Sequence, residues 1–376
     1  MKIMFYSQHV LGVGHFFRSM EIAGALHRHE VLFVEGGDPV PGFTAPGHVK
    51  RLFLPPLMMD SEFRTMETRG GSLDEIQSVR KRLLLDAWRD HAPDVLITEL
   101  FPFGRGQFRF ELMPLLEAVR RTRRKTKTIC SLRDILVEKK DEARYEQRVL
   151  DVLNTYYDVL LVHSDPGIFS LDTTFQRVKD IAVVLRYTGF IARGNSLVGA
   201  VRQGKRIVAS SGGGKVGVEL LAAAIGAVQS LADKSLRLDV FIGPFMDPGH
   251  RADLEALAWK DPRTRLKPFA PDFARELAQA ELSISMAGYN TCMDVLNSGV
   301  KALMYPFAAN REQSLRAGRL ERLNLVTVLD TLEAGGVAEA IERILDGPYP
   351  PAAREIFNMN GAVETALAVE NCLEQY

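Results

Sequence analysis

The sequence has few cysteines, no excess of either charge and no long apolar run. Its three cysteines, Cys130, Cys292 and Cys372, are scattered and form no CxxC pair, so neither a disulfide framework nor a zinc site is indicated. Lys plus Arg and Asp plus Glu both number 47. Because the charges balance, no overall field attracts nucleic acid, and we expect no nucleic-acid partner.

No stretch approaches the ~18 apolar residues of a membrane-spanning helix, and polar residues from Ser7 to His9 interrupt the apolar N-terminus before it resembles a signal peptide. We therefore expect a cytoplasmic protein. The basic segment 120–127 has two interpretations. It is the solvated C-terminus of a helix, where cations suit the helix dipole, or it makes peripheral contact with the inner face of a membrane.

Two kinds of catalytic motif are also missing. The sequence has no Asp-x-Asp and no cluster with metal-ligand spacing, so we expect neither a metal nor a cofactor. It also has no Gly-x-Ser-x-Gly elbow, which excludes the usual motif of serine hydrolases.

The sequence does contain a repeated alternation of apolar strands and amphipathic helices, in a chain of 376 residues that is long enough for about two domains. This alternation predicts the α/β class, with two Rossmann-like, doubly wound parallel-sheet domains that face a central cleft. We expect domains at 1–190 and 191–351, and a helical tail at 352–376 that packs in one domain or crosses between them. The expected strands are 2–7, 29–34, 94–98, 126–132, 158–163, 206–209, 238–242, 282–285 and 302–305.

The segment from Pro39 to Gly71 interrupts this alternation, because it is rich in Pro, Met and Phe and has no clear period. It is a mobile excursion near the cleft or a long packed loop.

A glycine loop follows the first expected strand. Gly12-x-Gly14, with Glu35 about 20 residues later, partly matches a dinucleotide-binding fingerprint, but Phe17 replaces the third glycine, which weakens the case for a dehydrogenase. His15 at the mouth of this loop is suited to take a proton from a hydroxyl at neutral pH. The alternative is a histidine at a helix start that bonds to the backbone.

The second half contains two further turns of small residues. Ser210 to Lys215 is a glycine-rich turn after a strand, without the frame of a P-loop. In Ile284 to Asp294, a strand leads through Ala287 and Gly288 into a helix start, where unpaired N–H groups attract anions. A carboxylate one turn into that helix leans back toward the turn, where it can accept hydrogen bonds from a ribose. The alternative is a buried strand followed by an ordinary amphipathic helix.

The strand ending at Tyr305 brings polar residues from Asn310 to Gln313 to the same edge. They contribute to the cleft or merely cap the helix that follows. In either case we expect Arg316, Arg319 and Arg322 on the exposed side of that helix.

These motifs together resemble family 28 glycosyltransferases of the GT-B fold, whose best-known member is the peptidoglycan N-acetylglucosaminyltransferase. The resemblance is carried by Gly12-Val-Gly-His15, by Ser285 to Pro306 and by Arg311-Glu-Gln313, and it covers both domains in order. More narrowly, Ser7 to Arg18 and Glu99 to Gly104 look like an uncharacterised bacterial branch of predicted glycosyltransferases.

The resemblance implies inverting, metal-independent transfer of a sugar from a UDP-sugar donor on the C-terminal domain to a hydroxyl of an unknown acceptor, which is a small molecule, a glycan or a lipid-linked compound. On the acceptor side it implies roles for Gly12 and Gly14. Independently of the resemblance, Arg105 and Arg109 beside an aromatic-rich loop indicate an anionic acceptor pocket, which a hydrolase would not need. His15 is the implied base, and Glu99 and Asp134 are rival bases whose alternative role is to bond a neighbouring arginine. The implied donor-site residues are Ser211, Gly212 and Gly213 for the phosphates, Phe269 and Ala270 for the base, Ala287, Gly288, Tyr289, Asn290 and Thr291 for the diphosphate, Asp294 for the ribose, and Gln313 for the donor sugar, together with the neighbouring Arg311 and Glu312.

In two respects the sequence departs from the family pattern. The ribose-binding acid is usually glutamate and here is aspartate, and the first loop has fewer glycines than that of the peptidoglycan enzyme. Two other functions fit the same residues. A nucleotide-sugar hydrolase or epimerase needs the same donor site and a similarly placed histidine. A nucleotide-sugar-binding protein without turnover needs Asp294 but not His15.

Overall fold

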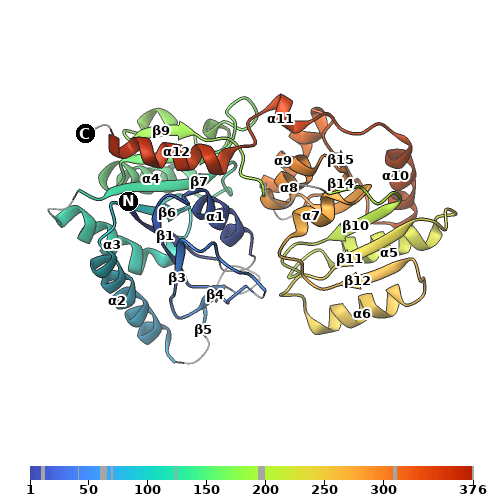
Figure 1. Cartoon of the computed structure of the whole chain (residues 1–376), viewed down its shortest axis with the longest axis horizontal. Helices are drawn as coiled ribbons and strands as arrows, with labels where there is room; N and C mark the ends of the chain where they lie inside the picture. The colour runs from blue at the N-terminus through green and yellow to red at the C-terminus, as the bar shows by residue number, and fades with distance from the viewer. Residues whose placement is uncertain are drawn as a thin grey trace. The chain divides into compact units, whose positions relative to one another are not determined.

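The computed structural model describes residues 1–9, 13–40, 42–59, 66–68, 71–122, 125–193, 200–307 and 311–374. The chain divides into two compact units (Figure 1). Unit 1 consists of Met1–Ile191 and Asn360–Tyr376, and unit 2 consists of Ala192–Met359. Each unit has its own hydrophobic core around its own sheet.

Unit 1 is built on a parallel sheet of seven strands in the order β3-β2-β1-β6-β7-β8-β9. The central strands are buried along their whole length, as expected for strands covered on both faces by helices. The strands are β1 (Lys2–Ser7), β2 (Glu30–Glu35), β3 (Val49–Phe53), β6 (Val95–Glu99), β7 (Lys127–Arg133), β8 (Val159–His163) and β9 (Val184–Tyr187). The helices of this unit are α1 (Gly14–Ala25), α2 (Leu73–His91), α3 (Arg109–Arg121), α4 (Glu142–Tyr156) and α12 (Gly361–Glu374).

Unit 2 is built on a parallel sheet of six strands in the order β12-β11-β10-β13-β14-β15. The strands are β10 (Arg206–Ser210), β11 (Arg237–Phe241), β12 (Thr264–Lys267), β13 (Leu282–Met286), β14 (Lys301–Tyr305) and β15 (Thr327–Val328). The helices are α5 (Val218–Ser230), α6 (Pro248–Ala258), α7 (Phe273–Ala278), α8 (Tyr289–Ser298), α9 (Arg311–Arg322), α10 (Ala334–Asp346) and α11 (Ala353–Ile356). Two parallel-sheet α/β units confirm the predicted fold class.

Both sheets share one feature of topology that positions the functional residues. The first strand of each unit lies in the middle, with the second strand on one side and the fourth on the other, so the direction of winding reverses there. In doubly wound folds, ligands bind outside the carboxyl ends of the strands at this switch point. The switch point of unit 1 lies between β1 and β6, and that of unit 2 lies between β10 and β13.

The segment predicted to interrupt the alternation supplies a strand of the main sheet. Within it, β3 pairs in parallel with β2 at the edge of the unit 1 sheet. A short antiparallel pair, β4 (Leu57–Met59) and β5 (Met66–Thr68), follows it. The expectation of an excursion or loop is therefore wrong for residues 49–53. Lys50 and Arg51 hide this strand in the sequence, because an edge strand tolerates charged side chains that a central strand does not.

The helical tail at the C-terminus is divided between the units. Helix α11 belongs to unit 2, whereas α12 lies with unit 1, where it packs against α1 (Figure 1). His29 Nε2 lies 2.8 Å from Glu370 Oε1 of α12. The Thr365 hydroxyl lies 3.4 Å from Nδ1 of the buried His163, at the end of β8. The last helix of the chain thus contributes to the core of the unit that contains the first strand.

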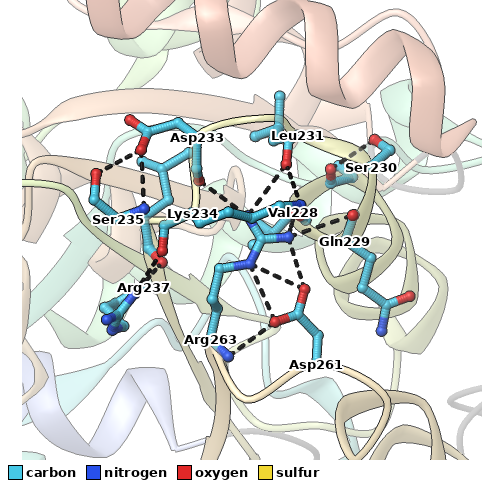
Figure 2. A network of polar contacts seen from close by, with 12 residues as sticks. Val228, Gln229, Ser230, Leu231, Asp233, Lys234, Ser235, Arg237, Asp261 and Arg263 are labelled. Atoms are coloured by element: carbon cyan, nitrogen blue, oxygen red, sulfur yellow. Dashed lines mark hydrogen bonds and ion pairs between the residues drawn. The ribbon is translucent and has the colours of Figure 1, made fainter.

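A buried arginine completes the C-terminal end of α5 in unit 2. Figure 2 shows the guanidinium group of Arg263 among the last carbonyl groups of that helix. It donates hydrogen bonds to the carbonyl oxygens of Val228 (2.5 Å) and Leu231 (3.3 Å) and to the carboxylate of Asp261 (Nη2 to Oδ2, 2.7 Å). A cation here satisfies carbonyls that have no partner within the helix and complements the helix dipole. This network is structural and lies away from the switch point.

Among the residues that the structure describes, no helix is long and apolar enough to cross a membrane.

Candidate active site

The switch point of unit 1 brings His15 and Glu99 together. Helix α1 begins at Gly14, directly after the loop that follows β1, and Glu99 is the last residue of β6. Because β1 and β6 are neighbours in the sheet, residues far apart in the sequence meet at this edge. His15 Nδ1 lies 2.6 Å from Glu99 Oε1. The Glu99 side chain is fully buried, whereas the imidazole retains 21% of its exposure.

The surroundings of this pair fix its protonation. Burial would raise the pKa of the Glu99 carboxyl, but the contact with His15 and the positive charges of Arg18 and Arg105 outweigh it and hold that pKa well below its usual range. Burial lowers the pKa of His15 despite the opposing charge of Glu99. A neutral imidazole beside a carboxylate donates its Nδ1–H, so the basic lone pair of His15 is on Nε2.

Arg18, one turn after His15 on α1, also donates a hydrogen bond to Glu99 Oε1. Its side chain is 3% exposed. The sequence contained it within the motif that carries the family resemblance, but its role became visible only when the fold brought β6 next to α1. Its spacing of three residues from His15 was the available signal, since residues three apart share one face of a helix.

The other residues predicted to be bases or to lie on the acceptor side differ in burial and in their distance from the sheet edge along the chain. Asp134 is buried directly after β7, at the same edge of the sheet. Arg109 begins α3 and is exposed, whereas Arg105 is buried in the loop after β6. Gly12 lies outside the described residues.

The switch point of unit 2 is lined by small residues from two loops. Ser211, Gly212 and Gly213 follow β10, and Ala287 and Gly288 follow β13. These strands are neighbours. The backbone at Gly212 has φ +72°, which favours glycine. The two loops therefore expose backbone groups at one edge of the sheet.

Helix α8 starts within this group of loops. Its N-cap residue, Gly288, provides no side-chain cap, and a Cβ atom built there would meet no atom within 4 Å. Tyr289, Asn290 and Thr291 form the first turn. Their N–H groups and the helix dipole favour an anion beside Gly288.

Arg316 of α9 lies beside this helix start, contrary to the sequence prediction that it faces solvent. The side chain is fully buried, and Nη1 donates a hydrogen bond of 2.9 Å to the carbonyl oxygen of Ala287. Its guanidinium carbon lies 5.7 Å from the centre of the Tyr289 ring. Arg316 thus fixes the loop before α8 and adds a positive charge next to it. The prediction was wrong because α9 packs this face onto the loop, a tertiary contact that helical periodicity does not reveal.

Asp294, on α8, is held by an arginine that the sequence did not single out. Arg193 Nε lies 3.1 Å from Asp294 Oδ2, and Nη2 donates a second hydrogen bond to the same oxygen. Arg193 Nη1 also donates to the carbonyl oxygen of Pro271 (2.7 Å). The carboxylate is 2% exposed. Arg193 lies in a stretch without periodicity, so no sequence signal pointed to it.

Two further groups of predicted donor residues lie in unit 2. Phe269 and Ala270, in the loop after β12, are partly exposed just before the carbonyl that Arg193 contacts. At the start of α9, Arg311 is exposed, whereas Glu312 and Gln313 are buried. The backbone N–H of Phe307 donates to Gln313 Oε1 (3.0 Å), which orients that side-chain amide. Asn310 lies outside the described residues.

A separate cavity of unit 2, about 550 Å³ in volume, lies at the amino ends of the strands, where Lys205, Leu236 and Glu281 line it. It is not part of the candidate site, because ligands of doubly wound sheets bind at the carboxyl ends. In the part of the chain that the structure describes, no group of three or more His, Cys, Asp and Glu side chains could hold a metal ion.

Comparison with known proteins matches a family domain to the second half of the chain. Residues 213–364 match the glycosyltransferase family 28 C-terminal domain. No curated protein sequence matches the chain.

Three solved structures illustrate the likeness of the fold. CalG4, the calicheamicin glycosyltransferase, is 17% identical with a TM-score of 0.56, over 97% of this chain and 94% of that chain. TcCGT1, solved in complex with UDP, is 12% identical with a TM-score of 0.62, over 98% and 94%. MurG from Acinetobacter baumannii is 14% identical with a TM-score of 0.54, over 100% and 99%.

At these identities the likeness concerns the fold, which all three share with this chain over nearly its whole length. The match of residues 213–364 to the family 28 domain and the two-sheet architecture together support a family 28-like glycosyltransferase of the GT-B fold.

Proposed function

We propose that this glycosyltransferase transfers a sugar from a UDP-sugar to an acceptor hydroxyl with inversion at the anomeric carbon, using His15 as the base and no metal ion. The observation that carries the proposal is the contact of 2.6 Å between His15 Nδ1 and Glu99 Oε1 at the switch point of unit 1. A histidine whose Nδ1–H is held by a buried carboxylate has its other nitrogen free to accept a proton.

In the proposed reaction, Nε2 of His15 removes the proton of the acceptor hydroxyl as its oxygen attacks the anomeric carbon. The bond between that carbon and the diphosphate oxygen breaks, and its electron pair leaves with UDP. One displacement inverts the configuration. The buried Glu99 keeps the imidazole in the productive tautomer and stabilises the positive charge that it acquires. General-base assistance of this kind contributes roughly 100- to 10,000-fold in rate.

We assign the binding of the departing diphosphate to residues of unit 2. The N–H groups at the start of α8 and the charge of Arg316 behind Ala287 would stabilise it, with Ser211, Gly212 and Gly213 on the other side. Loss of one donor from a site that stabilises developing negative charge typically lowers the rate by about 100- to 1,000-fold. These groups could neutralise the leaving group without a divalent ion.

Asp294 is assigned to the ribose, with Arg193 holding the carboxylate in position through its fork of N–H groups. Phe269 and Ala270 would border the base, and Gln313, whose oxygen is already bonded to Phe307 N–H, would offer its NH₂ group to the donor sugar. UDP as the nucleotide is supported by the presence of UDP in the structure of TcCGT1, which shares the fold.

The test is an assay of UDP release from a panel of nucleotide sugars, with and without cell extract as a source of acceptor. We expect release that depends on the extract, that persists in EDTA and that yields a product of inverted configuration by NMR. Equal release without extract would indicate a hydrolase rather than a transferase. Binding of UDP without any turnover would indicate a nucleotide-sugar-binding protein.

A further inference from the structure

Arg105 is a buried arginine whose hydrogen-bonding capacity is only partly used. Its side chain is 6% exposed, and its Nε lies 3.7 Å from Glu99 Oε2, within the range of an ion pair but beyond that of a hydrogen bond. Both Nε and Nη2 are buried without a hydrogen-bond partner, and so is Glu99 Oε2. Buried donors of this kind are rare in folded proteins and usually mark a ligand site or a bound water.

Nε and Nη2 form the edge of the guanidinium group that grips a carboxylate or phosphate with two parallel hydrogen bonds. Among the residues that the structure describes, several arginines use that edge to hold a carboxylate, and four buried or half-buried examples illustrate it. Their Nε–O distances lie between 2.6 and 3.2 Å. These pairs are Arg51 with Glu35, Arg80 with Glu111, Arg193 with Asp294, and Arg263 with Asp261. Arg105 has the same edge in the same kind of buried setting, but the nearest carboxylate oxygen, Glu99 Oε2, lies 3.7 Å from Nε and forms no hydrogen bond with it.

The positive charges around Arg105 outnumber the negative charge of Glu99, which favours an additional anion. Glu99 supplies one negative charge and faces two guanidinium groups, those of Arg18 and Arg105. Burial lowers the pKa of Arg105, and the positive charge of Arg133 at the end of β7 lowers it further, against the opposing effect of Glu99. A negatively charged group beside Arg105 would therefore relieve repulsion as well as form hydrogen bonds.

The loop that carries Arg105 is held firmly in place. The Leu100 N–H donates to the carbonyl oxygen of Ser131 (2.8 Å), and the Tyr145 hydroxyl donates to that of Phe103 (2.6 Å). Arg105 itself has φ +58°, in the left-handed region that few side chains adopt. Strain of this kind persists only where surrounding contacts enforce it, and it is concentrated at functional sites. The guanidinium group is thus preorganised rather than free to seek another partner.

We propose that Arg105 binds an anionic group of the acceptor, a carboxylate or a phosphate, next to the hydroxyl that His15 deprotonates. The inference rests on the proposed function for the role of His15, and it restricts the acceptor to compounds that carry a negative charge near the reacting hydroxyl. Arg105 would act in binding and orientation, and proton transfer would remain with His15.

The first experiment measures binding alone, by thermal unfolding of the full chain with saturating UDP, so that the donor phosphate site is filled. The probes are inorganic phosphate, glucuronate and, as the neutral match of glucuronate, glucose. We expect phosphate or glucuronate to raise the midpoint of wild-type unfolding and glucose to leave it unchanged. Arg105→Met should abolish the rise, and Arg105→Lys, which keeps the charge but not the fork, should retain part of it.

The control is Arg89→Met on α2, an exposed arginine paired with Asp86, which should respond to the probes like the wild type. Without any probe, Arg105→Met should unfold at the same temperature as the wild type or a higher one, because it removes a buried charge with unpaired donors. A lower midpoint for Arg105→Met in buffer would identify Arg105 as structural. A wild type that does not respond to phosphate or glucuronate, or an Arg105→Met variant that responds like the wild type, would overturn the proposal.

The second experiment compares transfer to acceptors that differ only in charge, such as glucuronate and glucose, or glucose and its 6-phosphate. Wild type should prefer the anionic member in kcat/KM, and Arg105→Met should lower that preference by about 10- to 100-fold. Equal loss with both members would contradict a role in acceptor choice. Failure of UDP to bind or be released in the wild type would instead refute the proposed function itself, irrespective of Arg105.

Discussion

At the switch point of unit 1, the loop after β1 leads into a helix whose first turn holds His15, beside a carboxylate and two buried arginines. At the same point of unit 2, the loops after β10 and β13 hold Ser211, Gly212 and Gly288, and the helix start beside them has no side-chain cap. The strand order around both points is the same. Unit 1 therefore offers charged side chains where unit 2 offers backbone N–H groups.

This difference shows that the topology determines the location of a site, whereas the residues determine its chemistry. The strand order determines where a ligand can reach the carboxyl ends of the strands, and it does so equally in both units. The side chains determine whether that place is suited to proton transfer or to binding a diphosphate. The predictions below alter one switch point at a time and ask whether the other is affected.

The largest effect is expected for His15→Ala, which should lower kcat by about 100- to 10,000-fold because no base then accepts the acceptor proton. UDP affinity, measured by calorimetry, should remain that of the wild type, since the residues that we propose to bind the donor belong to unit 2. Glu99→Gln serves as the companion variant, and a smaller loss is expected from it. If His15→Ala kept full turnover while Glu99→Gln lost it, the base would be Glu99.

On the other side of the comparison, Asp294→Ala should weaken UDP binding by about 1–3 kcal/mol, because ribose hydroxyls lose their buried acceptor. The variant also leaves Arg193 without its carboxylate, so the double variant Arg193→Met with Asp294→Ala tests whether loss of stability contributes. Asp239→Ala is the matched control, because Arg206 pairs with Asp239 on β11 in the same unit. Unchanged UDP affinity in both Asp294 variants would remove this residue from the donor site.

A smaller change tests the backbone site itself. Gly288 has φ −65°, and a Cβ atom there would meet no atom within 4 Å, so Gly288→Ala should fold with the stability of the wild type. The added methyl group would stand where we expect the diphosphate, and UDP affinity should fall about tenfold, equivalent to ~1.4 kcal/mol. Gly335→Ala on α10 is the control, with equal space for a Cβ. Equal UDP affinity for the two variants would show that no ligand approaches Gly288.

The smallest effect is expected in the pH dependence of kcat/KM, which tests the protonation state of His15 in unit 1. A base must be unprotonated, and burial lowers the pKa of His15, so kcat/KM should stay constant as the pH falls through 6.5, the ordinary value for histidine. The negative charge of Glu99 opposes that shift, so Glu99→Gln should move the acidic limb of the profile to still lower pH. A limb centred at pH 6.5 in the wild type would indicate an imidazole that is not desolvated.

The sequence was sufficient to predict the central strands and the fold class. Strands such as β1 and β8 contain runs of four apolar residues, Ile3 to Tyr6 and Val159 to Val162, because both faces of a parallel sheet are covered, and such runs are visible without a structure. In the two large sheets, the strands that escaped prediction lie at the edges: β3, β9, β12 and β15. Their residues are partly exposed, so these strands lack the apolar pattern by which a buried strand is recognised in a sequence.

The candidate site was less accessible to prediction, because its contacts join distant parts of the chain. Motif matching named His15 and Glu99 separately, as rival bases, and only the pairing of β1 with β6 brings them into contact. Arg193 and Arg316 carried no local signal, since an arginine in a loop or on an amphipathic helix is normally solvated. Both owe their positions to tertiary packing against Asp294 and Ala287.

The return of the chain to unit 1 makes that unit discontinuous, with unit 2 inserted between Ile191 and Asn360. Cutting the protein at the limits of the matched family domain, 213 and 364, would remove β10 from the middle of the second sheet and leave part of α12 without its packing partner. A fragment for separate study of donor binding should therefore run from Ala192 to Met359. Unit 1 cannot be isolated by truncation alone, because its last helix, α12, comes after unit 2 in the sequence.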